Sequence, residues 1–229
     1  MSQIRLPGNP PIDVVLRRSA RARRLSLRMS QLDGRVTLTL PKNLPESQGV
    51  AFLREKESWL RGHLAGRQAD VVVGLGAQIP VEGEILRIEP GQGRSVRRGD
   101  GVLLVPGADD RVAARVKGWL RTLARDRLAE ACDEYALRLG RPYDRLTLRD
   151  TRSRWGSCTH DGGLMFSWRL ILAEREILDY VAAHEVAHLA EMNHSPAFWA
   201  QVERIYGDWK PARNWLRDNG SALHRFKFE

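Results

Sequence analysis

The sequence predicts an α+β fold, with a β-rich N-terminal portion over residues 1–107 and a mixed C-terminal domain over residues 108–229. Short alternating apolar runs fill the first part, a long helical stripe opens the second, and strands and amphipathic helices then follow each other. Of the 229 residues, 42% are apolar and 28% charged, as in folded globular proteins. No run approaches the roughly 18 apolar residues of a membrane span, so disordered, fibrous and membrane-embedded classes are excluded.

Most elements expected in the first portion are strands. Residues 24–28 and 35–40 alternate between polar and apolar side chains, and Asp33-Gly34 between them is a hairpin turn signal. Residues 46–64 repeat apolar side chains at helical spacing, which predicts one amphipathic helix. Residues 74–90 and 101–106 read as further short strands.

The boundary between the two portions is expected at the turn-forming run 106–110. An apolar stripe then begins at Val112 and continues to Leu139, where Gly140 ends it, so a long helix is predicted. Residues 145–149 and 164–172 are expected to be strands, and helical periodicity returns from Glu174.

Charge is distributed unevenly along the chain. Residues 1–107 hold 17 basic and 10 acidic residues, whereas residues 108–229 hold 20 and 18, within a total net charge of +9. The basic first part is compatible with contact to nucleic acid, but a solvated, arginine-rich strand and turn is the better explanation, because no recognition motif accompanies the charge. The densest run contains Arg17, Arg18, Arg21, Arg23, Arg24 and Arg28.

The cysteine content and the N-terminus predict a cytoplasmic protein. The first residues lack the apolar core of a secretory signal. The two cysteines, Cys132 and Cys158, form neither a disulfide framework nor a metal-finger spacing, which suits a reducing compartment.

Histidines are concentrated in one short segment. Of the six in the chain, His184, His188 and His194 fall within 11 residues. Positions i and i+4 of a helix share a face, so the imidazoles of His184 and His188 can converge on one ion. Glu185 can reach a water at that ion without ligating it, which is the position of a general base. The alternative interpretation is a hydrogen-bonded histidine pair on a packed helix.

The third ligand must come from outside this helix. A helix continuing to His194 would rotate that residue away by about 100° per position. Asn193 can end the helix, and Ser195-Pro196 resembles an N-cap followed by a proline at the first position of another helix. We therefore expect His194 between two helices.

Two carboxylates, Glu191 and Glu203, compete with His194 as the third ligand, because carboxylates replace imidazoles in such sites. Three ligands and one open position define a catalytic zinc site, whereas structural sites normally have four protein ligands. Zinc acidifies water and polarises a carbonyl, and Glu185 would carry the proton from that water to the leaving amine. The pattern thus predicts Zn²⁺-dependent hydrolysis without a covalent intermediate.

Longer motifs extend this pattern over most of the chain, and on them the sequence resembles the YgjP-like metallopeptidase domain family, a relative of SprT-like and other zincin proteases. The motifs are Arg154–Cys158 (RWGSC), Trp168–Leu170 (WRL), Tyr180–Leu189 (YVAAHEVAHL) and Asn193–Trp199 (NHSPAFW), with weaker likeness at Arg17–Arg21 and Lys56–Trp59.

The resemblance implies a zincin-like C-terminal domain that hydrolyses peptide bonds, with His184, His188 and His194 as zinc ligands and Glu185 as catalytic carboxylate. The interval from the first to the third histidine equals that of metzincins, but Glu191 stands where they have glycine, so that clan is not assigned. Family members are also catalogued as nucleotide pyrophosphatases, and SprT-like relatives act on proteins at DNA.

Three functions are therefore compared: a zinc metallopeptidase acting on peptides, a metal-dependent nucleotide pyrophosphatase, and a nucleic-acid-associated protein with a vestigial site. Residues 164–172 are expected to line the cleft and pair with an extended substrate. No substrate-binding residue or oligomeric state is assigned. Cleft-wall roles for Arg154, Trp155 and Ser157, and oxyanion roles for Tyr180, Tyr206 and His224, compete with purely structural ones.

Overall fold

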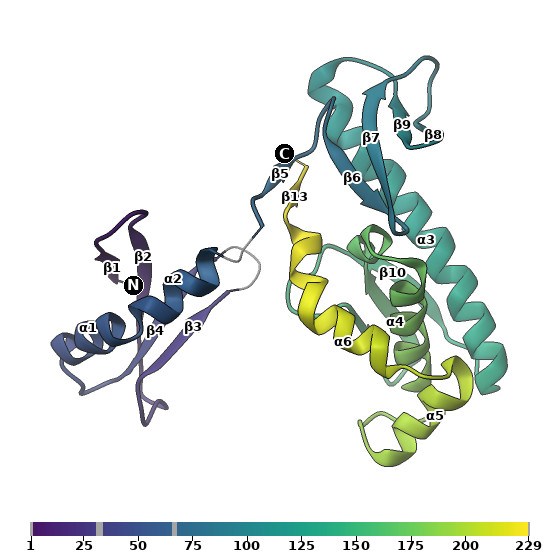
Figure 1. Ribbon diagram of the computed structural model, residues 1–229. Coiled ribbons are helices and arrows are strands. Elements are labelled where there is room, and N and C mark those ends of the chain that lie inside the picture. The colour runs from purple at the N-terminus through teal and green to yellow at the C-terminus, as the bar shows by residue number, and fades with distance from the viewer. Residues whose placement is uncertain (1, 31–33, 66–67, 229) are drawn as a thin grey trace. The chain divides into compact units, whose positions relative to one another are not determined.

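The computed structural model describes residues 2–30, 34–65 and 68–228, which form two compact units. The first unit comprises Met1–Ala69 and the second Asp70–Glu229, and each contains both strands and helices, so the expected α+β class is confirmed (Figure 1). The boundary expected near residue 107 lies inside the second unit. Strands before it and helices after it share one apolar core, and no local turn signal reveals that packing.

The first unit is a four-stranded sheet with two helices on one face. Its strands are β1 (Ser2–Leu6), β2 (Ile12–Ser19), β3 (Ser26–Met29) and β4 (Val36–Pro41), in the order β1-β2-β4-β3. The expected hairpin is confirmed as the antiparallel pair β3–β4, although Asp33 of its turn lies outside the described residues. Strands β1 and β2 were not predicted.

Alternation along these strands buries one face of the sheet against the helices. The expected single helix is two, α1 (Glu46–Glu55) and α2 (Glu57–Ala65), because the helix is interrupted at Lys56. The apolar core of this unit consists of Leu6, Ile12, Val14, Leu16, Val36, Leu38, Leu40, Leu53 and Leu60.

The second unit begins with a small sheet that packs on a long helix. Its strands are β6 (Gln78–Val81), β7 (Glu84–Pro90), β8 (Arg97–Arg98) and β9 (Val102–Val105), in the order β6-β7-β9-β8. The helix α3 (Val112–Leu139) has the predicted bounds, and Gly140 ends it in the left-handed conformation at φ 76°. Every fourth residue from Val112 to Leu128 is buried, which places one stripe of α3 in the core.

A second sheet and three further helices complete this unit. The sheet contains β10 (Arg145–Arg149), β11 (Gly156–Cys158) and β12 (Gly163–Ser167), with β12 in the middle. Helices α4 (Arg175–Ala187), α5 (Pro196–Tyr206) and α6 (Lys210–Asn219) follow, and α4 packs against α3. A short parallel pair joins β5 (Val71–Val72) to β13 (Phe226–Lys227).

The strand expected over residues 164–172 is only half correct. It ends at Ser167, and Trp168–Leu172 form a 3-10 helix whose five residues are all buried. Moreover, β12 has β10 on one side and β11 on the other, so its main chain is already paired, and β10 and β11 are the two edges of the sheet. Apolar runs of this length do not distinguish a central strand from a buried helical turn. None of the helices described here combines the length and apolarity needed to cross a bilayer.

Candidate metal centre and active site

Helix α4 carries the first part of the site. Its buried side chains, among them Ile177, Leu178 and Val181, hold it in the core of the second unit. His184 and Glu185 lie near its C-terminal end, and His188 is the C-cap residue. The rings of His184 and His188 have centroids 5.0 Å apart, as expected for positions one turn apart.

The chain turns immediately after α4 and brings His194 back to the other two histidines. The helix ends at Ala187, earlier than the end expected at Asn193, and Asn193 instead accepts a hydrogen bond from the Ser195 backbone N–H through its side chain. Ser195 then caps α5 as predicted, because its hydroxyl accepts from the Phe198 N–H at 3.4 Å. His194 therefore lies between α4 and α5.

The three imidazoles converge on one point. The Nε2 atoms of His184 and His194 are 3.0 Å apart, and one ring nitrogen from each histidine lies within 4.8 Å of the others. Nitrogen ligands about 2.0–2.1 Å from a tetrahedral zinc ion would be roughly 3.3 Å apart, so this spacing fits a metal. The group contains neither Glu191 nor Glu203, the carboxylates that compete for the third position.

The protonation states of these rings also fit a metal. Burial, followed by the neighbouring His188 and His194, lowers the pKa of His184 to about 3. Burial lowers the pKa of His188 as well. The neutral imidazole is the form that binds metals. His188 Nδ1 donates to the Glu191 carbonyl at 2.9 Å, which leaves Nε2 of His188 with its lone pair free for an ion.

Glu185 is buried beside this group. Its exposed fraction is 6%, and burial raises the pKa of its carboxyl to about 8, with partial opposition from the charge of Arg154. The side chain lies against Gly156 of β11, where a Cβ would be 2.5 Å from both Cγ and Oε1 of Glu185. A glycine at position 156 is thus what makes room for the carboxylate, a role that no local pattern in the sequence indicates.

Aromatic rings fix the histidine side chains in place. The ring of Phe198 stacks on His188 with centroids 4.4 Å apart, and Trp199 stacks on His194 at 5.8 Å. Trp199 is itself stacked on Trp209 at 4.1 Å. Trp209 precedes α6 and was missed, because stacking between segments leaves no local signal in the sequence.

The three side chains considered as oxyanion donors, Tyr180, Tyr206 and His224, are each held by contacts or burial within the protein. Tyr206 donates its hydroxyl to the Glu176 carbonyl at 3.0 Å, and His224 packs against Trp155 with centroids 5.2 Å apart. Burial raises the pKa of the Tyr180 phenol to about 12, so that group is neutral at pH 7.

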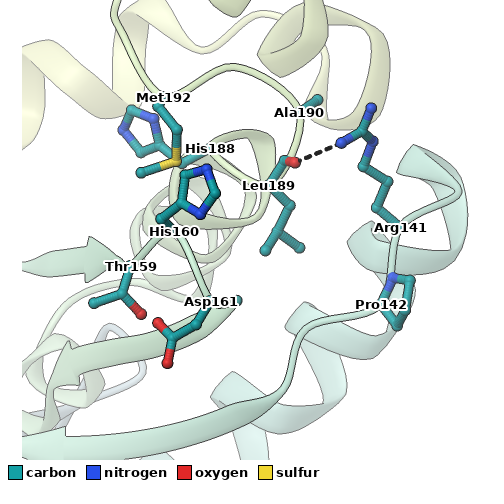
Figure 2. A pocket seen from close by; sticks show the side chains of 10 residues that line it. Arg141, Pro142, Thr159, His160, Asp161, His188, Leu189, Ala190 and Met192 are labelled. Atoms are coloured by element: carbon teal, nitrogen blue, oxygen red, sulfur yellow. Dashed lines mark hydrogen bonds between the residues drawn. The ribbon is translucent and has the colours of Figure 1, made fainter.

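A cavity of about 620 Å³ opens beside His188 (Figure 2). Met192 and His160 lie next to His188 in this view, and Leu189 and Arg141 line another side. The guanidinium of Arg141 donates to the Leu189 carbonyl at 2.9 Å, which ties the end of α3 to the turn after α4. Of the three histidines, His188 is the one that borders this space.

Three imidazoles able to hold one metal ion, with a buried carboxylate beside them, are the features expected of a metallopeptidase. The family model described as YgjP-like, metallopeptidase domain, matches residues 23–219. The chain belongs to this YgjP-like metallopeptidase family, as its motifs predicted. Membership implies a peptide substrate and a divalent metal ion, which the three histidines can bind.

The comparison with solved structures found the crystal structure of the metallopeptidase zymogen of Pyrococcus abyssi abylysin. That protein is 20% identical, and the match covers 43% of this chain and 97% of that one, with a TM-score of 0.37. The comparison with curated proteins found no match.

Proposed function

We propose that the protein is a zinc-dependent, zincin-like metallopeptidase in which His184, His188 and His194 hold the ion and Glu185 is the general base. The observation that carries this proposal is the convergence of three imidazole nitrogens within 4.8 Å beside a carboxylate that is 6% exposed. Zinc, when bound there, supplies the Lewis acidity that polarises a substrate carbonyl and acidifies water. The cytoplasmic location expected from the sequence stays a prediction.

Glu185 carries the proton transfers in this scheme. A carboxylate whose pKa is raised by burial is a stronger base than an exposed glutamate. The positive charge of a divalent ion bound beside it would lower that pKa again and favour the ionised form that acts as a base near pH 7. It takes a proton from the attacking water and delivers it to the nitrogen of the leaving amine. Gly156 keeps the carboxylate in position by leaving the space that a side chain would fill.

The edge strand β11 is the element that an extended peptide would pair with. It flanks Glu185 through Gly156, and one of its sides has no partner strand among the described residues. A peptide added there gains main-chain hydrogen bonds without specifying its side chains. We assign this role to β11 and no longer to the strand expected over residues 164–172, because the main chain of β12 is already paired on both sides.

The test is hydrolysis of an unfolded protein by wild type and by Glu185→Gln, with the metal content of both measured by elemental analysis. We expect one zinc per chain in both proteins, cleavage by wild type only, and loss of cleavage with a chelator. Absence of zinc from wild type, with none taken up on addition, would refute the proposal. Release of pyrophosphate from nucleoside triphosphates, abolished by Glu185→Gln and without peptide cleavage, would instead establish the pyrophosphatase alternative.

A nucleic-acid partner is a further part of the proposal, and the first unit is the region that supports it. Residues 1–69 contain 13 basic and 5 acidic residues, so this unit carries +8 of the total net charge of +9. Arg17 and Arg28 lie on the sheet face opposite the core, at register positions paired with Thr39 and Thr37. The exposed arginines of this unit that form no ion pair with a described residue include Arg17, Arg21, Arg23, Arg24 and Arg28.

A further inference from the structure

A second cavity lies on the outer face of the sheet that flanks Glu185. Its volume is about 430 Å³, and we call it the β11 groove; Arg145, Arg149, Arg154, Ser153 and Ser157 are among its lining residues. In the sheet register, Thr147 of β10 and Ser157 of β11 both pair with Met165 of β12, so these three side chains point to one face. The neighbouring Gly156 pairs with the buried Phe166 and faces Glu185 on the opposite side.

The chemistry of the β11 groove is that of an anion site. Three arginines and five hydroxyl side chains line it, and its lining includes no acidic residue. Arg145 is partly neutralised by Asp144 at 2.6 Å and Asp161 at 2.9 Å. By contrast, Arg149 and Arg154 are exposed and form no ion pair with any residue that the structure describes.

Hydroxyl donors accompany these two free guanidinium groups. Thr151 and Thr159 use their hydroxyls on local carbonyls, those of Arg154 and Gly163, at 2.8 and 3.1 Å. No such bond involves the hydroxyls of Ser153 or Ser157 among the residues described. Guanidinium groups with nearby hydroxyls form charge-assisted hydrogen bonds to carboxylates and phosphates. The groove thus offers positive charge and donors without a built-in counter-ion.

The position of the groove beside β11 determines which side chains of a bound peptide would point into it. Successive side chains of an extended peptide point to opposite faces of a sheet. A peptide paired with the β11 edge therefore sends every second side chain towards the groove and the alternate ones towards the face that holds Glu185. No aromatic residue lines the groove, so it lacks a surface on which a nucleobase could stack.

We propose that the β11 groove binds carboxylate side chains of the substrate. The enzyme then prefers peptides in which a residue whose side chain points towards Arg149 and Arg154, that is, every second residue of the bound peptide, is acidic. This inference rests on the proposed peptidase function and names its substrate class. The carboxylate of such a peptide serves as the counter-ion that the groove lining itself lacks.

The experiment uses a peptide series in which one residue at a time is Glu, Gln or Lys. Cleavage gives kcat/KM for wild type, and the Kd of each peptide for Glu185→Gln is measured by fluorescence anisotropy, which needs no turnover. We expect glutamate to improve both values about tenfold over glutamine at alternate positions, as one exposed charge-assisted contact would.

The groove variant is Arg149→Gln alone, because the charge of Arg154 also acts on Glu185. The matched control is Arg152→Gln, an exposed arginine of the loop after β10 that lies outside the groove lining. We expect the groove variant to lose the preference for glutamate while its cleavage of the glutamine peptides stays within about twofold, since only the charged contact is removed. The control should behave as wild type.

Each of the following outcomes either supports the inference or overturns it. Equal Kd values for Glu, Gln and Lys peptides would overturn the inference whether or not they are cleaved. A glutamate preference in binding that depends on Arg149, without any cleavage, would support the groove and refute the peptidase. Binding of a nucleoside triphosphate that depends on Arg149, with no preference among the peptides, would overturn the inference in favour of a phosphate site.

Discussion

The contact between Gly156 and Glu185 leads to a sharp prediction for Gly156→Ala. A Cβ at position 156 would lie 2.5 Å from Cγ and Oε1 of Glu185 and 2.8 Å from Cδ. Unstrained carbon contacts lie at about 3.5–4.0 Å, so the carboxylate must move by roughly 1 Å. Because a misplacement of about 1 Å can cost about a hundredfold in rate, we expect kcat for peptide hydrolysis to fall by that order.

The same geometry indicates that Gly156→Ala displaces the carboxylate of Glu185 and leaves the three histidines in place. The three atoms nearest to the added Cβ are Cγ, Oε1 and Cδ of Glu185, so the closest contacts are with the outer part of a side chain and not with a histidine. Zinc content should therefore stay at the wild-type value, and the melting temperature should change little. KM should change less than kcat, because the displaced group takes part in proton transfer.

A matched glycine provides the control. Apart from its chain neighbours and the backbone of its own helix, Gly118 of α3 has no atom within 4 Å of the position that a Cβ would occupy, and it does not require a positive φ. Gly118→Ala should keep wild-type activity and gain up to about 1 kcal/mol in the free energy of unfolding, as expected in a helix. Wild-type kcat in Gly156→Ala would refute the positioning of Glu185, and loss of zinc in that variant would contradict the separation of carboxylate from ligands.

Three further predictions follow from other contacts. Trp199→Leu removes the ring stacked on His194 and should weaken zinc affinity by about 10–100-fold in a chelator competition, as loss of ligand support does; unchanged affinity would show that the stack is dispensable. Burial lowers the pKa of His224 to about 4, so between pH 6.5 and 4 the unfolded chain binds a proton that the folded one does not, and stability falls on acidification by at most about 1.4 kcal/mol per pH unit. Urea unfolding at pH 7 and 5 should show a shallower dependence in His224→Gln, and an identical dependence would contradict this assignment. Binding of a DNA duplex should weaken with salt and be lost in a glutamine variant of the five arginines but not in Arg121→Gln/Arg125→Gln, and salt-independent binding would exclude a phosphate contact. The five arginines are Arg17, Arg21, Arg23, Arg24 and Arg28.

Features encoded by short-range periodicity were predictable. The bounds of α3 follow from an apolar side chain at every fourth position and from Gly140, which adopts the left-handed conformation. The cap at Ser195 and the spacing of His184 and His188 are similarly local, and the structure brings these two rings and His194 together. The roles of the three histidines and Glu185 in binding metal and in catalysis stay predictions.

Features that depend on partners far along the chain were missed. The unit boundary falls near residue 69 because the β6–β9 sheet joins the core of α3 and α4. The 3-10 helix at 168–172 replaces half of an expected strand, because burial alone permits either structure. Neither result is visible in a window of ten or fifteen residues.

The sequence by itself determined the family, the α+β class and the residues able to bind a metal, because motif spacing and helical periodicity act within a few turns of one segment. Only the tertiary structure decided that Gly156 touches Glu185, that Trp209 supports Trp199, and that Arg149, Arg154 and Ser157 line one groove. Each of these contacts joins separate segments, and its existence depends on strand register and helix packing, which the whole core determines together.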